Sequence, residues 1–328
     1  MGETRFDIVA MGDAIVDVIA ACDDDFLDRH GLPRGSMQLL SPEAADRLYD
    51  AMGQARETSG GSAANSMAGI AAMGGRAAFI GQVAQDQLGM IFEHDLRSLG
   101  VHFDTPPLVG GPPTGRCLIL VTPDGQRTMN TAPGASHELV EDAISETLIR
   151  DSAILYLEGY LFGPDKPRRA MRKAVEIAHA AGREVAFTLS ESVCITERAD
   201  RFTKFIDSGA IDLLFCNEDE AMKLTGTGDL DAALAALRPK VPTLVVTRGA
   251  DGALVDEKGV RTDVAAAPIE KVVDTTGAGD MFAAGFLAAR ARGMDAKKCL
   301  ETGALAAADV IQHYGARPEG NLKEKVAL

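Results

Sequence analysis

The sequence predicts an α/β fold with a mainly parallel sheet, helices on its faces and a small β-rich appendage. Apolar strand patterns at 152–157, 184–189 and 211–215 alternate with other segments, among them a helix pattern at 166–181. Strands separated by helices imply right-handed crossovers and parallel pairing. The chain has 328 residues, of which 46% are hydrophobic. This is enough to bury a sizeable core, so we expect one large domain with an appendage.

The charge balance excludes several classes of protein. There are 33 basic and 48 acidic residues, a net charge of −15, and no long basic run. A protein that neutralises nucleic-acid or membrane phosphates needs such a run, so we expect neither partner. The five cysteines are scattered, with no C-x-x-C, which indicates reduced thiols. No signal peptide opens the chain and no apolar run would span a membrane, so we expect a cytoplasmic protein.

The first two expected strands carry acids. The strand at 6–11 ends in Gly12-Asp13, and the next, at 15–20, contains Asp17 among β-branched residues. A buried acid is costly unless it is paired or functional. The alternative is that Asp17 lies on a solvated face of its strand.

The next polar feature is a glycine pair before a helix. Gly60 and Gly61 precede a small-residue helix pattern at 62–73, and Asn65 lies near its start. The glycines permit a close approach to the backbone. Tight helix packing explains the alanines and Gly69 of this segment, but it does not explain Asn65. A strand at 77–83 and a helix at 86–99 follow.

A β-rich subdomain is expected from two separate segments, about 15–40 and 101–132. In the second segment, apolar runs at 117–121 and 127–131 flank Pro123-Asp124-Gly125, which is typical of a hairpin. Arg127 on this hairpin is a candidate to reach a bound phosphate or substrate. An exposed arginine at a sheet edge explains it equally well.

Polar residues follow the strand at 211–215, where Asn217 and Glu220 open the next helix. Open α/β sheets bind ligands at the carboxyl ends of their strands. Helix capping alone would explain Asn217 and its neighbour Glu218.

The segment 272–286 provides the strongest candidate for a reactive site. Val272 and Val273 are expected to end a buried strand, and Gly277-Ala278-Gly279 forms a turn before an apolar helix. The first amides of that helix, with its dipole, make an anion site. Asp280 lies beside this site and is placed to accept a proton from an attacking hydroxyl. The alternative is a glycine turn followed by an ordinary acid in a first helical turn.

The motifs D-T-T-G-A-G-D at 274–280 and S-G-G-S-A-A-N at 59–65 together resemble the two signatures of the ribokinase family of carbohydrate and purine kinases. The resemblance covers essentially the whole chain, 1–328. It implies a ribokinase-like fold in which the β-rich subdomain is a lid over the substrate. It further implies that Asp280 is the catalytic base and that the amides of Gly277, Ala278 and Gly279 form the anion hole.

The same resemblance assigns the other candidate residues. Contacts to the substrate fall on Asp13, Asp17, Gly60, Gly61 and Asn65, with Arg127 as a further candidate. The residues expected to bind the nucleotide and its phosphates are Asn217, Thr247, Arg248, Gly249, Gly252 and Thr276. Glu220 is expected to bind magnesium. The implied cofactors are ATP and Mg²⁺, K⁺ being left open, and the implied assembly is a monomer or homodimer.

The expected function is ATP-dependent phosphorylation of a primary hydroxyl of a small molecule. The segment 125–131 resembles the bacterial adenosine-kinase-like branch, which favours a nucleoside, adenosine above all, converted to AMP. The base would lie against Cys117, Leu118 and Leu120 or against Phe162, with Tyr160, Phe187 and Phe103 as further stacking candidates.

Alternatives to this function stay open. A free sugar or a sugar acid is one, because Arg116 and Arg127 could bind a carboxylate. A non-catalytic nucleoside or nucleotide sensor on the same fold is another. A P-loop kinase is excluded because the chain has no Walker lysine motif. A nicotinamide-dependent oxidoreductase is disfavoured, since Gly12-Asp13-Ala14 stands where G-x-G-x-x-G would follow the first strand.

Overall fold

A computed structural model describes residues 4–190 and 192–328. Within them, a nine-stranded sheet has the order β14-β13-β12-β11-β10-β9-β1-β5-β6. The pairs β12–β13 and β13–β14 are antiparallel and the others are parallel. The strands are β1 (Phe6–Met11), β5 (Ala77–Ile80), β6 (His102–Phe103), β9 (Ser152–Glu158), β10 (Glu184–Thr188), β11 (Leu213–Asn217), β12 (Thr243–Thr247), β13 (Ala253–Glu257) and β14 (Val260–Val264). The expected parallel α/β architecture is confirmed.

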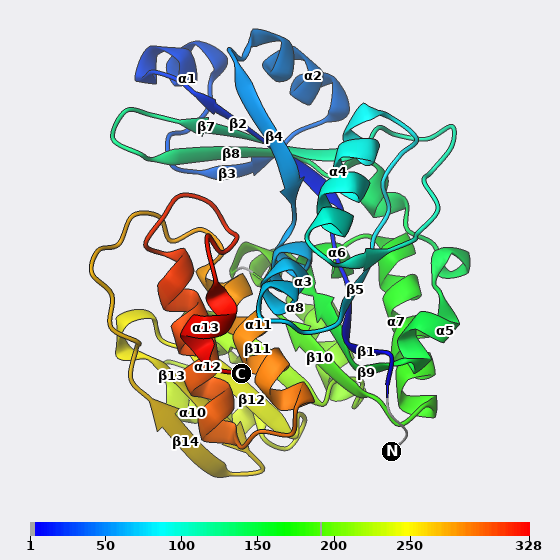
Figure 1. Cartoon of the computed structure of the whole chain (residues 1–328), viewed down its shortest axis with the longest axis vertical. Helices are drawn as coiled ribbons and strands as arrows, with labels where there is room; N and C mark the ends of the chain where they lie inside the picture. The colour runs from blue at the N-terminus through cyan, green and yellow to red at the C-terminus, as the bar shows by residue number, and fades with distance from the viewer. Residues whose placement is uncertain (1–3, 191) are drawn as a thin grey trace.

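Helices cover both faces of this sheet (Figure 1). One face carries α3 (Ser62–Ala72), α11 (Ala278–Ala291), α12 (Ala296–Val310) and α13 (Leu322–Val326). The other carries α5 (Glu146–Arg150), α6 (Gly159–Phe162), α7 (Asp165–Ala180), α8 (Ser192–Asp207), α9 (Glu218–Thr225) and α10 (Leu230–Leu237). Strand β1 shows the alternation that produces this layering. Ile8 and Ala10 join the core of the first face, and Val9 and Met11 join that of the second.

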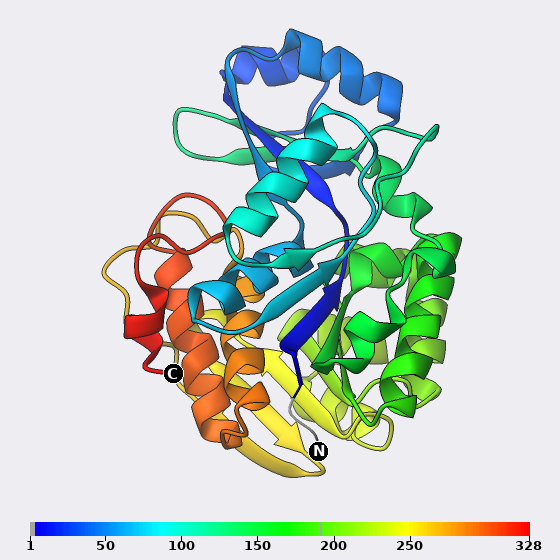
Figure 2. The ribbon, with the colours of Figure 1, turned by 45° about the vertical axis from the view of Figure 1, so that its right-hand side comes forward.

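A second, five-stranded sheet has the order β3-β8-β7-β2-β4. Its strands are β2 (Ile15–Ala21), β3 (Met37–Leu39), β4 (Ala55–Gly60), β7 (Gly115–Val121) and β8 (Arg127–Ala132). Helices α1 (Asp24–His30) and α2 (Pro42–Ala51) cover the face of this sheet that carries Val18 and Leu118. The opposite face lies toward the large sheet (Figures 1 and 2). Helix α4 (Gln87–Ser98) packs against β4 beside it.

Two features differ from the sequence prediction. Strand β4 was not foreseen, because A-R-E-T-S-G has no apolar alternation and pairs through its backbone with β2. The expected strand at Val272 and Val273 is wrong: these residues are irregular and Val272 is 51% exposed. The amide of Val273 donates to the carbonyl oxygen of Ile311 instead of joining a sheet ladder.

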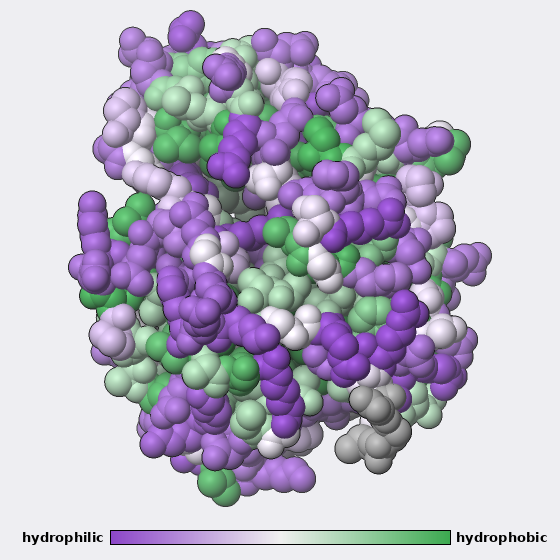
Figure 3. Space-filling model, in the orientation of Figure 1, coloured by the Kyte–Doolittle hydropathy of each residue, from purple (hydrophilic) through white to green (hydrophobic). Residues whose placement is uncertain are grey.

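The face seen in Figure 1 is mostly hydrophilic, with hydrophobic residues scattered over it in small groups (Figure 3). Among the described residues, no helix has the length and apolar character needed to cross a bilayer.

Candidate active site

A cavity of about 130 Å³ lies at the carboxyl ends of the parallel strands. Its lining includes Thr188, Asn217 and Thr247, which are the last residues of β10, β11 and β12. It also includes Gly279 and Asp280 at the start of α11. The full lining is Ser62, Tyr156, Thr188, Ser190, Phe215, Cys216, Asn217, Glu220, Thr247, Gly279, Asp280, Phe282 and Ala283. Several candidate site residues that lie far apart in the sequence therefore line one cavity.

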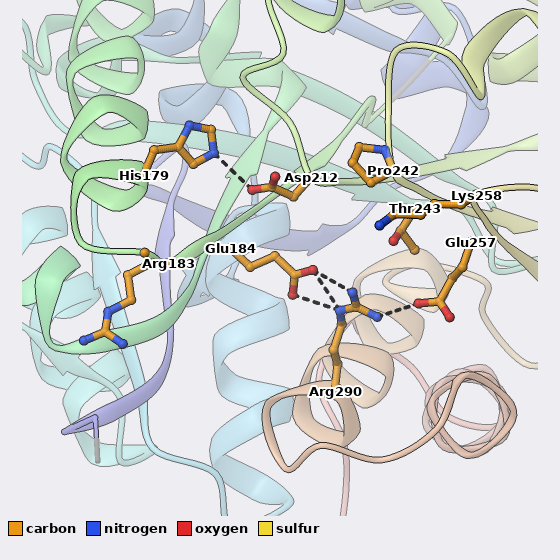
Figure 4. A pocket seen from close by; sticks show the side chains of 10 residues that line it. His179, Arg183, Glu184, Asp212, Pro242, Thr243, Glu257, Lys258 and Arg290 are labelled. Carbon is orange, nitrogen blue, oxygen red and sulfur yellow. Dashed lines mark hydrogen bonds and ion pairs between the residues drawn. The ribbon is translucent and has the colours of Figure 1, made fainter. Parts of the chain in front are cut away.

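A larger groove, of about 850 Å³, lies at the opposite ends of the same strands (Figure 4). Glu184 and Thr243 begin β10 and β12 there. The side chain of Arg290 bonds to Glu184 and Glu257 across the groove, at 2.6 and 2.9 Å. Because ligands of open α/β sheets bind at the carboxyl ends, we assign the site to the smaller cavity and a structural role to the Arg290 ion pairs.

The start of α11 is open to a ligand. Gly277 is the N-cap with φ of 78°, and a Cβ there would lie 2.6 Å from the Cα of Ala316. Glycine is therefore required at this turn. A Cβ on Gly279 would meet nothing within 4 Å, so the second position of the helix faces open space. The N-cap residue has no side chain to cap this helix, and the amide of Ala278 donates to the carbonyl oxygen of Thr275 (3.2 Å). The start of the helix and its dipole fit a phosphate group.

Asp280 is held by residues of the first glycine-rich motif. Its Oδ1 accepts a hydrogen bond from Ser62 Oγ (2.6 Å), and its Oδ2 accepts one from Asn65 Nδ2 (3.1 Å). Ser66 Oγ donates to its carbonyl oxygen (3.0 Å). Burial raises the pKa of Asp280 above its ordinary value, against the hydrogen bonds and the charge of Arg317, which lower it. A carboxylate with a raised pKa is suited to accept a proton.

Asp17 lies on the second sheet above Gly60. Each of its carboxylate atoms would lie within 2.6 Å of a Cβ on Gly60, so this glycine makes room for the acid. Burial raises the pKa of Asp17 to about 6, against the charges of Arg317 and Arg127. Gly61 has φ of 93°, and a Cβ there would lie 2.2 Å from the carbonyl oxygen of Asp13. Both glycines of the motif therefore have a structural reason to lack a side chain.

Asp13 lies at the exit of β1 and is tied to a second buried acid. Its Oδ1 accepts from Ser136 Oγ at 2.8 Å. Its backbone amide donates to Glu158, whose other carboxylate oxygen accepts from the amide of Ala63 at 2.7 Å. Burial and the charge of Asp13 raise the pKa of Glu158 well above its ordinary value. Sequence reasoning missed Glu158, which fastens the Asp13 segment to α3.

Arg127 reaches from the hairpin to the segment before α11. Its Nη2 lies 2.7 Å from Asp274 Oδ2 and its Nη1 3.4 Å from Thr276 Oγ1. Asp274 also accepts from the amides of Thr276 (3.0 Å) and Gly315 (2.9 Å). The reading of Arg127 as an exposed edge residue is therefore wrong, because its side chain is only 12% exposed.

Asn217 and Glu220 form a reciprocal cap at the start of α9. Asn217 Oδ1 accepts from the amide of Glu220 (2.8 Å), and Glu220 Oε2 accepts from the amide of Asn217 (3.0 Å). Both line the cavity. In the described part of the chain, no three His, Cys, Asp or Glu residues gather as a metal cluster. Mg²⁺ commonly uses one or two carboxylates together with substrate phosphates, so a single acid at this edge fits it.

The glycine-rich turn after β12 lies beside Thr247. Arg248 Nη2 pairs with Asp263 at 3.2 Å, and Gly249 opens a short 3₁₀ turn that ends at Asp251. Gly252 has φ of 86°, and a Cβ there would lie 2.0 Å from the carbonyl oxygen of Val264. Thr247 lines the cavity, whereas Arg248, Gly249 and Gly252 do not.

The prediction that an aromatic side chain stacks on the base is wrong for three of the four residues. Phe103, Phe162 and Phe187 are at most 1% exposed and lie in the two cores. Phe162 and Phe187 pack on each other with ring centroids 5.6 Å apart. Tyr160 is partly buried and packs against the core of the second face.

The hairpin residues that were predicted to contact the base lie on opposite faces of the second sheet. Leu118 and Leu120 lie on the face of β7 opposite to Cys117, and Leu120 lines a cavity with Phe26 of α1 and Ala51 of α2, so they point away from the large sheet. Cys117 is in register with Asp17 and lies on the inner face of the second sheet. Of the three hairpin residues named for the base, only Cys117 is on the side that faces the site.

One residue at the site gave no signal in the sequence. Arg317 Nε donates to Asn65 Oδ1 (3.1 Å), and its Nη1 donates to Ser59 Oγ (2.7 Å) and lies 3.2 Å from Asp95 Oδ2. It follows α12 in an irregular segment, so no periodicity marks it.

The fold and this arrangement are those of a ribokinase-like sugar or nucleoside kinase. The sequence profile of the pfkB family carbohydrate kinases matches residues 7–322. The chain belongs to this family.

Solved structures and relatives agree with that assignment. Adenosine kinase from Sinorhizobium meliloti is 46% identical, with a TM-score of 0.91 and 98% of each chain covered. A probable sugar kinase from Rhizobium etli is 43% identical, with a TM-score of 0.91, covering 98% of this chain and 97% of the other. Guanosine-inosine kinase of Escherichia coli is 29% identical over 232 residues, which are 68% of this chain. The chain spans 53% of the length of that enzyme.

Proposed function

We propose that this protein transfers the γ-phosphoryl group of ATP to the primary hydroxyl of a nucleoside, and that adenosine, converted to AMP, is its acceptor. The observation that carries the proposal is the meeting of the two glycine-rich motifs at Asp280. Ser62 and Asn65 hold the carboxylate of Asp280 beside the uncapped start of α11. This arrangement supports a base beside an anion site, as phosphoryl transfer to a hydroxyl requires.

In the proposed reaction, Asp280 accepts the proton of the acceptor hydroxyl. The hydroxyl oxygen forms a bond to the γ-phosphorus, the bond from that phosphorus to the bridging oxygen breaks, and ADP leaves. The amides of Gly277 and Gly279 would donate to the oxygens on which charge develops, and the amide of Ala278 would do so by giving up its bond to Thr275. The raised pKa of Asp280 supports its role as the base.

The triphosphate would run from this anion site toward Thr247 and the turn that contains Arg248, Gly249 and Gly252, with Thr276 and Asn217 beside it. Glu220 would hold Mg²⁺, which neutralises phosphate charge when bound. Arg127 is the further cation at this edge. Since it already pairs with Asp274, a bound phosphate would compete with that carboxylate for it.

The acceptor would lie between the two sheets, with the second sheet as its lid. Asp13, Asp17, Gly60, Gly61 and Asn65 would surround its sugar hydroxyls. The two acids suit hydroxyl groups, because a carboxylate accepts hydrogen bonds that a hydroxyl can donate. Cys117 lies beside Asp17 on the inner face and would contact the base.

Two contacts favour a neutral acceptor over a sugar acid. Arg116 is on the outer face of the lid, where it pairs with Asp46 and lies over the ring of Tyr49 on α2. Arg127 is neutralised by Asp274. Arg116 is not available to bind a carboxylate on the acceptor, and Arg127 would do so only in place of Asp274, so the similarity to adenosine kinase carries more weight than the sugar-acid alternative.

A free neutral sugar is the second candidate, and the similarity to a probable sugar kinase supports it. Its polar partners would be the same residues as those of a ribose. A non-catalytic sensor is disfavoured, because Asp280 and its two hydrogen-bond donors would then have no reactive role.

The test is a comparison of ADP release with adenosine, guanosine, inosine, ribose and fructose as acceptors. We expect the kcat/KM for adenosine to exceed that for either sugar by at least about tenfold. Asp280→Asn should lower kcat by about 10²–10⁴-fold while ATP still binds. A sugar as the better acceptor would contradict the nucleoside assignment alone. Unchanged turnover in Asp280→Asn would contradict the proposed mechanism.

A further inference from the structure

Arg317 is fixed on two sides by residues of three different elements. Its Nε donates to Asn65 on α3, and its Nη1 contacts Ser59 on β4 and Asp95 on α4. Asp95 Oδ2 also accepts from the amide of Ser59 (2.9 Å) and from Thr58 Oγ1 (3.2 Å). Burial alone would raise the pKa of Asp95, but these bonds and the charge of Arg317 hold it below its ordinary value. The guanidinium plane therefore has a defined orientation.

The bond to Asn65 decides which way its amide points. A guanidinium nitrogen can only donate, so the oxygen of Asn65 faces Arg317 and its NH₂ group faces Asp280. A reversed amide would place its oxygen against the carboxylate. Arg317 thus acts through Asn65 on the orientation of Asp280.

The remaining nitrogen of Arg317 has no partner. Nη2 is buried, and no atom in the described parts of the chain accepts a hydrogen bond from it. A buried guanidinium N–H group without an acceptor is unfavourable and is usually satisfied by another group. Asp17 and Asp280 both act electrostatically on Arg317. Through Asn65, which accepts from Arg317 and donates to Asp280, the guanidinium is joined to the acids assigned to the acceptor.

We propose that Arg317 is an acceptor-site residue, whose Nη2 donates a hydrogen bond to one hydroxyl oxygen of a vicinal diol while its Nε holds Asn65 toward Asp280. This inference rests on the proposed function. The partner is a neutral hydroxyl rather than a carboxylate, because the positive charge of Arg317 is already paired with Asp95, 3.2 Å from its Nη1. Arg317 therefore binds the acceptor with one edge and positions the base with the other.

The test is a cycle that combines a protein change with the removal of a hydroxyl. Parent protein and Arg317→Met are titrated, without ATP, with adenosine, 2′-deoxyadenosine and 3′-deoxyadenosine, and the same ligands are assayed as acceptors. We expect Arg317→Met to weaken adenosine binding about 10- to 100-fold, with the KM for ATP changed less than about twofold. We expect the parent to bind one of the two deoxynucleosides at least about tenfold more weakly than it binds adenosine. Arg317→Met should bind that deoxynucleoside less than about twofold more weakly than it binds adenosine.

Two further variants separate contact from folding. Arg317→Lys keeps the charge without the planar fork and should recover part of the affinity. Should Arg317→Met fail to fold, the same cycle is run on Arg317→Lys. Arg76→Met is the matched control, because it removes an arginine paired with Asp7 on the surface and should leave acceptor binding unchanged.

The outcomes separate this inference from the function on which it rests. The inference is wrong, and Arg317 is structural, if removing either hydroxyl lowers the affinity of the parent and of Arg317→Met by the same factor. It is also wrong if Arg317→Met binds adenosine with the affinity of the parent. Arg317-dependent binding of a nucleoside without phosphoryl transfer would contradict the proposed function alone. A parent protein that binds none of these acceptors contradicts both.

Discussion

Arg127 Nη2 on the hairpin of the second sheet lies 2.7 Å from Asp274 Oδ2, three residues before the turn that begins α11. The two side chains are 12% and 9% exposed. Asp274 also accepts from the amides of Thr276 and Gly315, so it joins the hairpin of the second sheet to the segment before α11 and to the segment that carries Arg317. A change in the position of the second sheet would therefore act on the start of α11 through one carboxylate.

The first prediction concerns the strength of this link. The cycle of Arg127→Met, Asp274→Asn and the double variant should give a coupling free energy of roughly 0.5–3 kcal/mol in urea unfolding. The pair is shielded from water, so its coupling should exceed that of a solvated pair. Arg150→Met with Glu146→Gln is the matched control. Its two side chains are 45% and 57% exposed, and an exposed helix pair couples by about 0.3–0.5 kcal/mol. Equal couplings for the two pairs would mean that Arg127 does not join the sheets.

The second prediction uses Gly60, the last residue of β4, and Gly53, which precedes that strand. A Cβ on Gly60 would lie 2.5 Å from the Cγ of Asp17, whereas a Cβ on Gly53 would meet nothing within 4 Å. Gly60→Ala should displace the Asp17 carboxylate and raise the acceptor KM by about tenfold or more, with the KM for ATP changed less than about twofold.

Gly53→Ala is the control and should behave like the parent in both assays. If Gly60→Ala kept the parent's acceptor KM, Asp17 would have room to move without loss, and its assignment to the acceptor would be wrong.

The strands and the reactive motif could be predicted from the sequence because they are local signals. The parallel strands are short apolar runs bounded by polar residues, and the start of α11 is marked by glycines in one continuous segment. The two motifs meet through a bond between Ser62 and Asp280, 218 residues apart. Only the family resemblance linked them, since nothing in either segment indicates its partner.

The missed residues depend on distant contacts. Arg317 bonds to Asn65 and Ser59, which precede it by 252 and 258 residues. Glu158 is the last residue of β9, and it becomes a site residue only because the amides of Asp13 and Ala63 converge on it. Val272 and Val273 have strand composition but are irregular, and the amide of Val273 donates to the carbonyl oxygen of Ile311. Composition alone therefore predicted the wrong structure there.

The third prediction concerns the groove at the amino ends of the strands (Figure 4). Arg290 ties the end of α11 to β10 and β13 through Glu184 and Glu257. Arg290→Met leaves two carboxylates without their cation and should destabilise the fold by on the order of 1–3 kcal/mol in urea unfolding. Lys258→Gln, at the exposed rim of the same groove, is the control and should stay within about 0.5 kcal/mol of the parent. A loss of activity in Arg290→Met without a loss of stability would contradict the structural role.

The last prediction concerns the pH dependence that Asp17 gives to stability. Burial raises the pKa of Asp17 from 3.8 to about 6. Between these two values the folded protein holds a proton that the unfolded chain has released. Stability therefore falls as pH rises through this window and then levels off. Asp17→Asn removes both the charge and the titration. The free energy of unfolding of this variant should therefore exceed that of the parent only slightly at the acid end of the window, and by the largest amount above pH about 6.

Urea unfolding of parent and variant across that pH window measures this difference, and an advantage on the order of 1–3 kcal/mol is expected at its neutral end. The same variant should bind the acceptor more weakly, with KM raised about 5- to 150-fold, because an amide does not replace a charged acceptor of hydroxyl hydrogen bonds. Greater stability together with weaker binding would identify Asp17 as an acid kept buried for the ligand. A variant less stable than the parent at neutral pH would instead mean that Arg317 and Arg127 need the charge of Asp17 to hold the fold, and the acid would then be structural.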